Sequence, residues 1–226
     1  MEPVQLPEAL FRFLSELKKN NNREWFQRNK TRYEREVRGP VLQLIAWLAD
    51  PIGRLSSHIV VDPRPHGGSM FRIYRDTRFS PDKSPYKTHV GVQFRHEGAR
   101  DAHAPGFYFH LEPGRVMAAA GIWRPDSRTT YRIRQAIAEQ PDVWQKATAF
   151  LSDRFQLVGD SLKRPPRGFP PNHPLMADLK RKEFIAVTHF AEAEACSPQF
   201  PGQLAGAFRR MSPLVRFVCH ALQLPF

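Results

Sequence analysis

The 226-residue sequence is poor in cysteine and contains no long apolar segment. Its two cysteines, Cys196 and Cys219, lack metal-ligand spacing and are too few for a disulfide framework, so we expect buried thiols in a reducing compartment. No apolar run approaches the roughly 18 residues that a membrane-spanning helix needs. Residues 1–5 have neither the basic start nor the apolar stretch of a signal peptide. These absences predict a cytoplasmic protein without a membrane partner.

The motifs of several large enzyme classes are missing as well. The chain has no phosphate-binding loop, dinucleotide fingerprint, nucleophile elbow or zincin helix. No nucleotide cofactor is therefore expected, while a divalent metal stays open. Because there is no internal repeat, low-complexity tract or clear domain boundary, residues 1–226 are expected to form one domain.

Positive charge is what the sequence has in excess. Its 34 lysines and arginines against 22 acidic residues give a formal net charge of +12. Such a charge attracts anionic partners, including phosphate, nucleotides, nucleic acid and acidic proteins. The basic residues are not confined to one tail, so a generally arginine-rich surface is the alternative interpretation.

Hydrophobic periodicity predicts an α+β fold. Apolar residues at helical spacing in 1–50 predict N-terminal helices, with a capping box at Asn21 and Glu24 and a break or kink at Gly39-Pro40. Residues 57–123 change to a period of two, which predicts an antiparallel sheet. Residues 125–226 return to a helical period and contain a basic, proline-rich loop at 159–174.

The expected sheet has about five or six strands and is flanked by helices. Short connections between most neighbouring strands favour antiparallel pairing. The predicted strands are residues 58–62, 69–75, 89–97, 106–112 and 115–123, with a possible further strand at 183–190.

Side-chain alternation along these strands separates an apolar face from a polar one. The apolar set is expected to be buried together and comprises Phe71, Ile73, Val90, Val92, Phe94, Phe107, Phe109 and Leu111. The opposite set comprises Arg72, Tyr74, His89, Gln93, Arg95, Tyr108, His110 and Glu112. Such a mixture of tyrosine, histidine, arginine and glutamine is more typical of a cleft floor than of a solvated face, and Gly91 leaves room on that floor.

The segment from Arg72 to His89 is the predicted anion site. Arginine suits bidentate binding of phosphate or carboxylate, and two prolines stiffen the segment. The residues expected to bind the anion are Arg72, Arg75, Arg78, Lys83, Tyr86 and Lys87. Asp76 and Asp82 are expected to pair with some of these cations. If such pairs satisfy all of them, the segment is structural.

Two kinds of chemistry fit the polar face. His110 or Glu112 can act as acid or base beside an arginine-bound anion. Alternatively His89, His110 and Glu112, with an aspartate of the 72–89 segment, can hold a divalent metal, although their spacing matches no strong metal motif. In the second basic cluster, at 159–174, Phe169 can stack on a base, or the loop can be a stiff surface belt.

Several motifs resemble a known family. They are Phe13-Leu14 with the run from Asn20 to Phe26, Tyr33 and Pro40; the runs from Tyr74 to Ser80, Asp82 to Lys83 and Pro85 to Thr88; and Leu162, Pro166 to Phe169, His173-Pro174 and Leu179-Lys180. In this order they resemble the bacterial family called domain of unknown function 2461. The resemblance covers nearly the whole chain and implies a single-domain architecture. It implies no activity, cofactor or catalytic residue.

Two functional classes follow from these observations. The first is an anion- or phosphate-binding domain, which can act as an enzyme on a phosphorylated or otherwise anionic substrate. The second is a non-catalytic module that binds nucleic acid or an acidic protein through a basic surface. An enzyme needs its polar residues to converge, whereas a binding module needs charge along an extended face.

Overall fold

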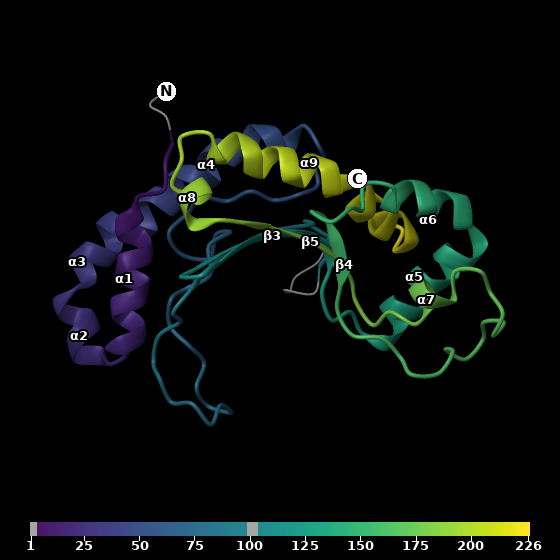
Figure 1. The fold of residues 1–226 in the computed structure, drawn as a ribbon, viewed down its shortest axis with the longest axis horizontal. Helices are drawn as coiled ribbons and strands as arrows, with labels where there is room; N and C mark the ends of the chain where they lie inside the picture. The colour runs from purple at the N-terminus through teal and green to yellow at the C-terminus, as the bar shows by residue number, and fades with distance from the viewer. Residues whose placement is uncertain (1–3, 99–103) are drawn as a thin grey trace.

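The computed structural model of the protein describes residues 4–98 and 104–226 and has the predicted α+β architecture. One antiparallel sheet of five strands, in the order β1-β2-β3-β5-β4, is flanked by helices in a single domain (Figure 1). The strands are β1 (Val90–Arg95), β2 (Gly106–Glu112), β3 (Arg115–Ile122), β4 (Gln156–Val158) and β5 (Phe184–Phe190). Among the described residues, no helix is both long and apolar enough to cross a membrane.

The N-terminal helices are α1 (Glu8–Lys19), α2 (Arg23–Arg28), α3 (Lys30–Tyr33), a π-helical turn η1 (Glu34–Arg38) and α4 (Gly39–Gly53). The expected kink at Gly39-Pro40 takes the form of this π-helical turn, which ends directly before it. Proline has no backbone N–H to donate to the preceding turn, so a change in the hydrogen-bond ladder is the natural outcome. The predicted capping box is wrong by one residue, because the Asn22 side chain accepts the Trp25 N–H at 2.9 Å.

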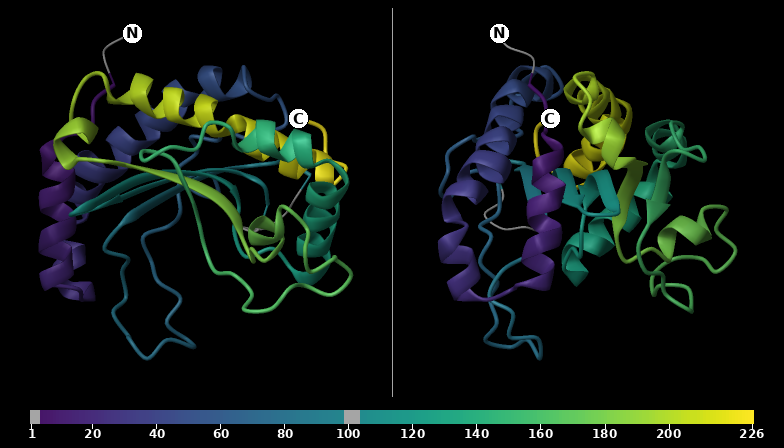
Figure 2. Two further views of the ribbon diagram at one scale, coloured as in Figure 1. Left: turned by 45° about the vertical axis from the view of Figure 1, so that its right-hand side comes forward. Right: turned by 60° about the vertical axis from the view of Figure 1, so that its left-hand side comes forward.

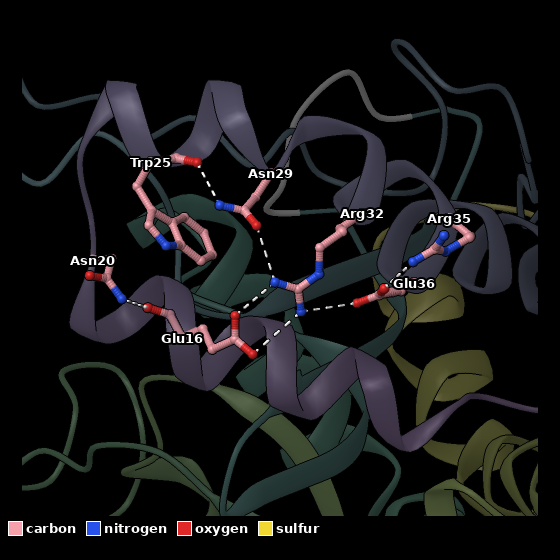
Figure 3. A network of polar contacts seen from close by, with 7 residues as sticks. All are labelled: Glu16, Asn20, Trp25, Asn29, Arg32, Arg35 and Glu36. Carbon is pink, nitrogen blue, oxygen red and sulfur yellow. Dashed lines mark hydrogen bonds and ion pairs between the residues drawn. The ribbon is translucent and has the colours of Figure 1, made fainter.

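Arg32 is the centre of a polar network that ties these helices together (Figure 3). Its guanidinium donates to Glu16 at 2.8 Å and to Glu36 at 3.3 Å, and also reaches the Asn29 side chain. Arg35 donates to the other oxygen of Glu36 at 2.6 Å. Arg32 and Arg35 are therefore paired with acids on a neighbouring helical turn and on α1.

Two of the predicted strands, 58–62 and 69–75, are not regular strands. They run beside β1 and pair with it through the isolated bridges Ile59 to His96 and Met70 to Val92. Beyond Met70 the strict alternation is lost, and Phe71 is 38% exposed instead of buried. The other seven residues of the predicted apolar set are buried, so the expected burial is wrong for Phe71 alone within that set.

Helix α9 (Phe200–Ala221) covers the apolar face of the sheet, with α4 beside it (Figure 1). Phe208 of α9 packs against Phe94 and Phe107, and its ring centroid lies 5.9 Å from that of Phe94 and 5.0 Å from that of Phe107. Phe200 contacts Phe109 in the same layer. Each fully buried aromatic side chain of this kind removes enough apolar surface from water to contribute roughly 2–3 kcal/mol.

The C-terminal part contributes more than helices. Its helices are α5 (Ser127–Glu139), α6 (Pro141–Thr148), α7 (Met176–Leu179) and α8 (Glu192–Ala195), besides α9. Strand β5 pairs with β3 in the interior of the sheet, and the short strand β4 pairs with β5 at the edge. The further strand predicted at 183–190 is present as β5, whereas β4 was not predicted, so the sheet takes two strands from the part that is otherwise helical.

Candidate functional site on the polar face of the sheet

The face of the sheet opposite α9 carries the polar side chains that alternation predicted to lie together. Strand pairing places Gly91 opposite His110 and Gln93 opposite Tyr108, which puts these four residues on one face. Two basic segments, the hairpin of residues 72–88 and the loop of residues 159–174, project from the side of the sheet away from α9 (Figures 1 and 2). We call the set His89, Gly91, Gln93, Tyr108, His110, Glu112 and Arg115 the polar sheet face.

A chain of hydrogen bonds runs along β2 on this face. The Tyr108 hydroxyl lies 3.1 Å from Nδ1 of His110, and Nε2 of His110 lies 3.3 Å from a carboxylate oxygen of Glu112. The three residues alternate in sequence, so a regular strand brings their side chains to the same side. His110 is 7% exposed, so this chain is shielded from bulk water at its centre.

The bonding partners of His110 assign its tautomer. The Glu112 carboxylate accepts hydrogen bonds, so Nε2 carries the proton and donates. Nδ1 of the neutral ring is then the acceptor, and the Tyr108 O–H donates to it. Tyr108 therefore donates to His110, and His110 donates to Glu112. In this arrangement His110 is the base, and the Glu112 carboxylate orients it and stabilises its charged form.

Burial changes the ionisation of this cluster. It raises the pKa of Tyr108 to about 12, so the phenol keeps its proton at neutral pH. It lowers the pKa of His110, against the opposing effect of the Glu112 hydrogen bond. His89 stacks on His110 with ring centroids 4.8 Å apart, and burial together with His110 lowers the pKa of His89 to about 4. Both imidazoles are therefore neutral at pH 7.

Cations surround the two neutral imidazoles. Lys87 and Arg115 both lower the pKa of His89, which places His89 within the fields of both charges. Burial lowers the pKa of Lys87, and the positive charge of Arg72 lowers it further. Lys87 donates to the backbone carbonyl of Arg72 at 2.8 Å and lies over the Phe71 ring.

No acidic residue pairs with these cations within the part of the chain that the structure describes. The guanidiniums of Arg72 and Arg115 form no ion pair there, and Glu112 is bonded to His110. At His89 the positive charges of Lys87 and Arg115 thus outnumber the one carboxylate of Glu112, while the charge of Arg72 acts on both Lys87 and Asp76. Such a surplus close to a buried polar chain favours a bound anion.

Because Gly91 has no side chain, the Tyr108 hydroxyl and the Phe71 ring can lie close to the backbone of β1. A Cβ atom at this position would come within 2.9 Å of the Tyr108 hydroxyl and of the Phe71 ring. A side chain here would therefore push the phenol away from its position over the strand. The room that Gly91 was expected to leave on the floor is therefore taken by the Tyr108 and Phe71 side chains.

The 72–88 hairpin contains two ion pairs of its own, besides the backbone hydrogen bonds from Arg75 to Pro85 and from Lys87 to Ile73 that cross it. Asp82 pairs with Arg75 and receives the Ser84 N–H, and these bonds hold its pKa far below the usual range. Asp76 pairs with Arg78 at 2.7 Å, mainly through a side-chain hydrogen bond that lowers its pKa to about 2. Of the predicted anion ligands, Arg75 and Arg78 thus have their acid partners inside the hairpin.

The predicted ligands other than Arg78 have three different placements. Lys83 donates to the Thr77 carbonyl at 2.9 Å and so helps to close the hairpin tip. Lys87 lies near the polar sheet face, where its charge lowers the pKa of His89, and Arg72 lies near Lys87 and Asp76. Arg75 and Tyr86 line a separate pocket between the hairpin and α2.

Asn21 anchors the hairpin to the N-terminal helices, a role that sequence reasoning missed. Its amide donates to the Tyr86 carbonyl at 2.9 Å and its carbonyl oxygen accepts the Tyr86 N–H at 3.1 Å. The Tyr86 ring also stacks on Phe26 of α2, with centroids 4.1 Å apart. The partners are 65 residues apart in sequence, so no local pattern could have revealed the contact.

The residues named for a metal site are not arranged as ligands. His89 and His110 stack face to face, and both ring nitrogens of His110 have protein partners. Among residues 4–98 and 104–226, no group of three or more histidine, cysteine, aspartate or glutamate side chains is placed to hold a metal ion.

The basic loop at 159–174 differs from expectation in one residue. Phe169 is buried against Tyr131, with ring centroids 5.7 Å apart, so it is not available to stack on a nucleic-acid base. Gly168, with φ of +87°, supplies the turn that lets the chain direct this phenylalanine inward. Lys163, Arg164 and Arg167 remain exposed on the loop.

Comparison with known proteins gives one family. The model of a family described as conserved hypothetical protein (DUF2461) matches residues 9–217. The match includes the hairpin, the polar sheet face and the basic loop. No curated protein matches the chain.

Proposed function

We propose that this chain, which belongs to the DUF2461 family, is an enzyme that carries out acid–base chemistry on an anionic substrate at the polar sheet face. The observation that carries the proposal is the hydrogen-bonded chain from Tyr108 through His110 to Glu112, beside cations that lack acidic partners among the described residues. The chain supplies a route for a proton, and the cations supply a place for negative charge.

The anion is held by Arg72, Lys87 and Arg115. Lys87 is a partly buried ammonium whose pKa burial lowers, so a bound anion would relieve its unfavourable desolvation. Arg72 adds a guanidinium that suits phosphate or carboxylate oxygens. The substrate class is therefore a small molecule that carries a phosphoryl or carboxylate group.

The proton moves along β2. As the substrate hydroxyl or a water gives its proton to the Tyr108 oxygen, the Tyr108 proton passes to Nδ1 of His110. The imidazolium that forms keeps its Nε2–H bonded to Glu112, whose negative charge stabilises it. The same path in reverse returns the proton to the product, so Tyr108 acts as the acid in the second half of the reaction.

The internal pairing of the hairpin suits this role. Ion pairs of Arg75 with Asp82 and of Arg78 with Asp76, together with the Asn21 anchor, support the backbone that presents Arg72 and Lys87. Groups fixed in advance lose little entropy when the substrate binds. The two free thiols, with burial raising the pKa of Cys219 to about 12, fit a cytoplasmic setting and have no part in the chemistry.

Activity measurements test the proposal. A panel of phosphomonoesters and of esters that carry a free carboxylate is assayed at pH 7 with the wild-type protein, Tyr108→Phe, His110→Gln and the control Arg28→Gln, whose exposed side chain pairs with Glu24 on α2. Turnover is expected for the wild type and the control, with kcat lower by about a hundredfold or more in the other two. Turnover that survives Tyr108→Phe unchanged, or no turnover of any panel member, would contradict the proposed chemistry.

A binding module remains the competing function because of the net charge of +12. It predicts salt-sensitive binding of RNA or DNA without turnover of the panel, since phosphate contacts release counterions. That result would assign the cations to nucleic-acid contact and would leave the Tyr108 chain without a catalytic role.

A further inference from the structure

We propose that the pocket between α2 and the 72–88 hairpin is a second ligand site, specific for a small phosphate-bearing molecule with a planar ring, such as a mononucleotide. The pocket has a volume of about 360 Å³ and is lined by Arg23, Gln27, Tyr74, Arg75 and Thr77, with Pro85 and Tyr86 as its wall. This volume lies toward the lower end of the range for small-molecule sites, which is roughly 300–1,000 Å³.

The pocket is separate from the polar sheet face because the hairpin stands between them. Tyr86 and Lys87 are consecutive residues of an extended segment, so their side chains point in opposite directions. Tyr86 stacks on Phe26 of α2, whereas Lys87 lies over Phe71 beside the sheet. A ligand in the pocket would therefore contact other residues than the substrate proposed above.

The charge of the pocket favours an anion. None of its lining residues is acidic, and two are arginines. Arg23 forms no ion pair or side-chain hydrogen bond with the residues that the structure describes, and its charge lowers the pKa of Tyr86 against the larger effect of burial. Arg75 uses two of its five N–H donors, for Asp82 and Ser80, and so has donors left for phosphate oxygens.

The aromatic residues of the pocket favour a planar ring. Tyr74 is 48% exposed, although its ring lies 5.5 Å from Tyr86 and 6.3 Å from Phe26. A large aromatic side chain held at the mouth of a polar pocket offers a stacking surface, and stacking on a base contributes about 1–3 kcal/mol. Gln27 and Thr77 supply the amide and hydroxyl groups that can bond to ring edges or a sugar.

Binding of three related compounds tests the site by calorimetry. Adenosine monophosphate carries both the phosphate and the ring, ribose 5-phosphate lacks the ring, and adenosine lacks the phosphate. The nucleotide is expected to bind at least about fivefold more tightly than ribose 5-phosphate, because a stacking contribution of about 1 kcal/mol corresponds to that factor. Adenosine is expected to bind more weakly still. Equal affinity for all three, or no binding of the nucleotide, would overturn the proposal.

Variants locate the binding. Arg23→Gln and Tyr74→Leu should each weaken nucleotide affinity about tenfold, while Tyr74→Phe keeps the stacking ring and should keep most of the affinity. Arg28→Gln is the matched control, because Arg28 lies on the same helix, is exposed and pairs with Glu24 outside the pocket. Undiminished affinity in Arg23→Gln would overturn the proposal.

Two further variants separate this site from the proposed active site. Tyr108→Phe and Lys87→Met should leave nucleotide affinity unchanged. If Lys87→Met abolishes nucleotide binding and Arg23→Gln does not, the nucleotide occupies the polar sheet face, which overturns the second site and supports the first. If nucleotide binding depends on Arg23 while the ester panel is not turned over, the second site stands and the proposed chemistry falls.

Discussion

Arg32 among the N-terminal helices and Lys87 on the hairpin show two different environments for a cation in this protein. Arg32 donates to Glu16 and Glu36, and those hydrogen bonds raise its pKa (Figure 3). Lys87 donates to a backbone carbonyl near the charge of Arg72, and its pKa is lowered by burial and by that charge. Folding favours the charged form of the first residue and disfavours the charged form of the second.

The difference separates a structural cluster from a functional candidate. In the helical network folding also favours the charged form of the acids. Their arginine partners lower the pKa values of Glu16 and Glu36, although burial opposes this for Glu36. Around the polar sheet face the groups are partly buried with an excess of like charge, and the pKa values of Lys87, His89 and His110 are all lowered. Unfavourable ionisation of this kind is retained where a ligand or a reaction uses it.

The largest effect is expected from His89. Its pKa of about 4 in the folded protein lies below the ordinary value of 6.5, so the unfolded chain binds more protons below pH 6.5. The contribution of His89 to stability is therefore present above pH 6.5 and is lost as the pH falls toward 4. Between pH 7.5 and pH 5, the free energy of unfolding should fall by about 2 kcal/mol more in the wild type than in His89→Gln.

Urea unfolding of the wild type and the variant at the two pH values measures this difference, and other titrating groups cancel in the comparison. Equal losses in both proteins would mean that His89 is as easily protonated in the folded state as in the unfolded one. Folding would then not disfavour the charged form of His89, and the polar sheet face would no longer differ from the helical network in this respect.

A smaller effect should distinguish two arginines directly. Arg32→Gln removes the hydrogen bonds to Glu16 and Glu36 and should lower the free energy of unfolding by about 1–2 kcal/mol. Arg72→Gln removes a cation that forms no ion pair in the described part of the chain and should change the free energy of unfolding by less than about 0.5 kcal/mol. The comparison fails if Arg72→Gln destabilises the protein as much as Arg32→Gln does.

Much of the fold and part of the site could be predicted from local patterns. The α+β class and the antiparallel sheet follow from hydrophobic periods, and alternation correctly placed Gln93, Tyr108 and His110 on one face. Alternation failed at Phe71, because residues 69–75 pair with β1 through the single isolated bridge of Met70 to Val92 and bend away from regular strand geometry. A period of two predicts which face a side chain occupies only while the chain is extended, because successive side chains then point to opposite faces.

Contacts between distant parts of the chain were beyond local patterns. The bonds of Asn21 to Tyr86 depend on how α2 meets the hairpin, and β4 is a three-residue edge strand without a repeated pattern. The pairing of Asp82 with Arg75 was among several that the charges alone allowed. Composition gives the surplus of positive charge, and the tertiary structure decides which cations are left without acids.

The central claim, that a neutral His110 bonded to Tyr108 and Glu112 lies beside an anion site, can be tested in one nitrogen NMR experiment on the imidazole groups. At pH 7 we predict a neutral His110 with its proton on Nε2, and a change in the His89 and His110 signals when inorganic phosphate replaces chloride at equal ionic strength. His58 and His96, which stack on each other beside the other end of β1, are the internal control and should not change. A His110 protonated on Nδ1, or phosphate-induced changes no larger than those of the control pair, would contradict the account.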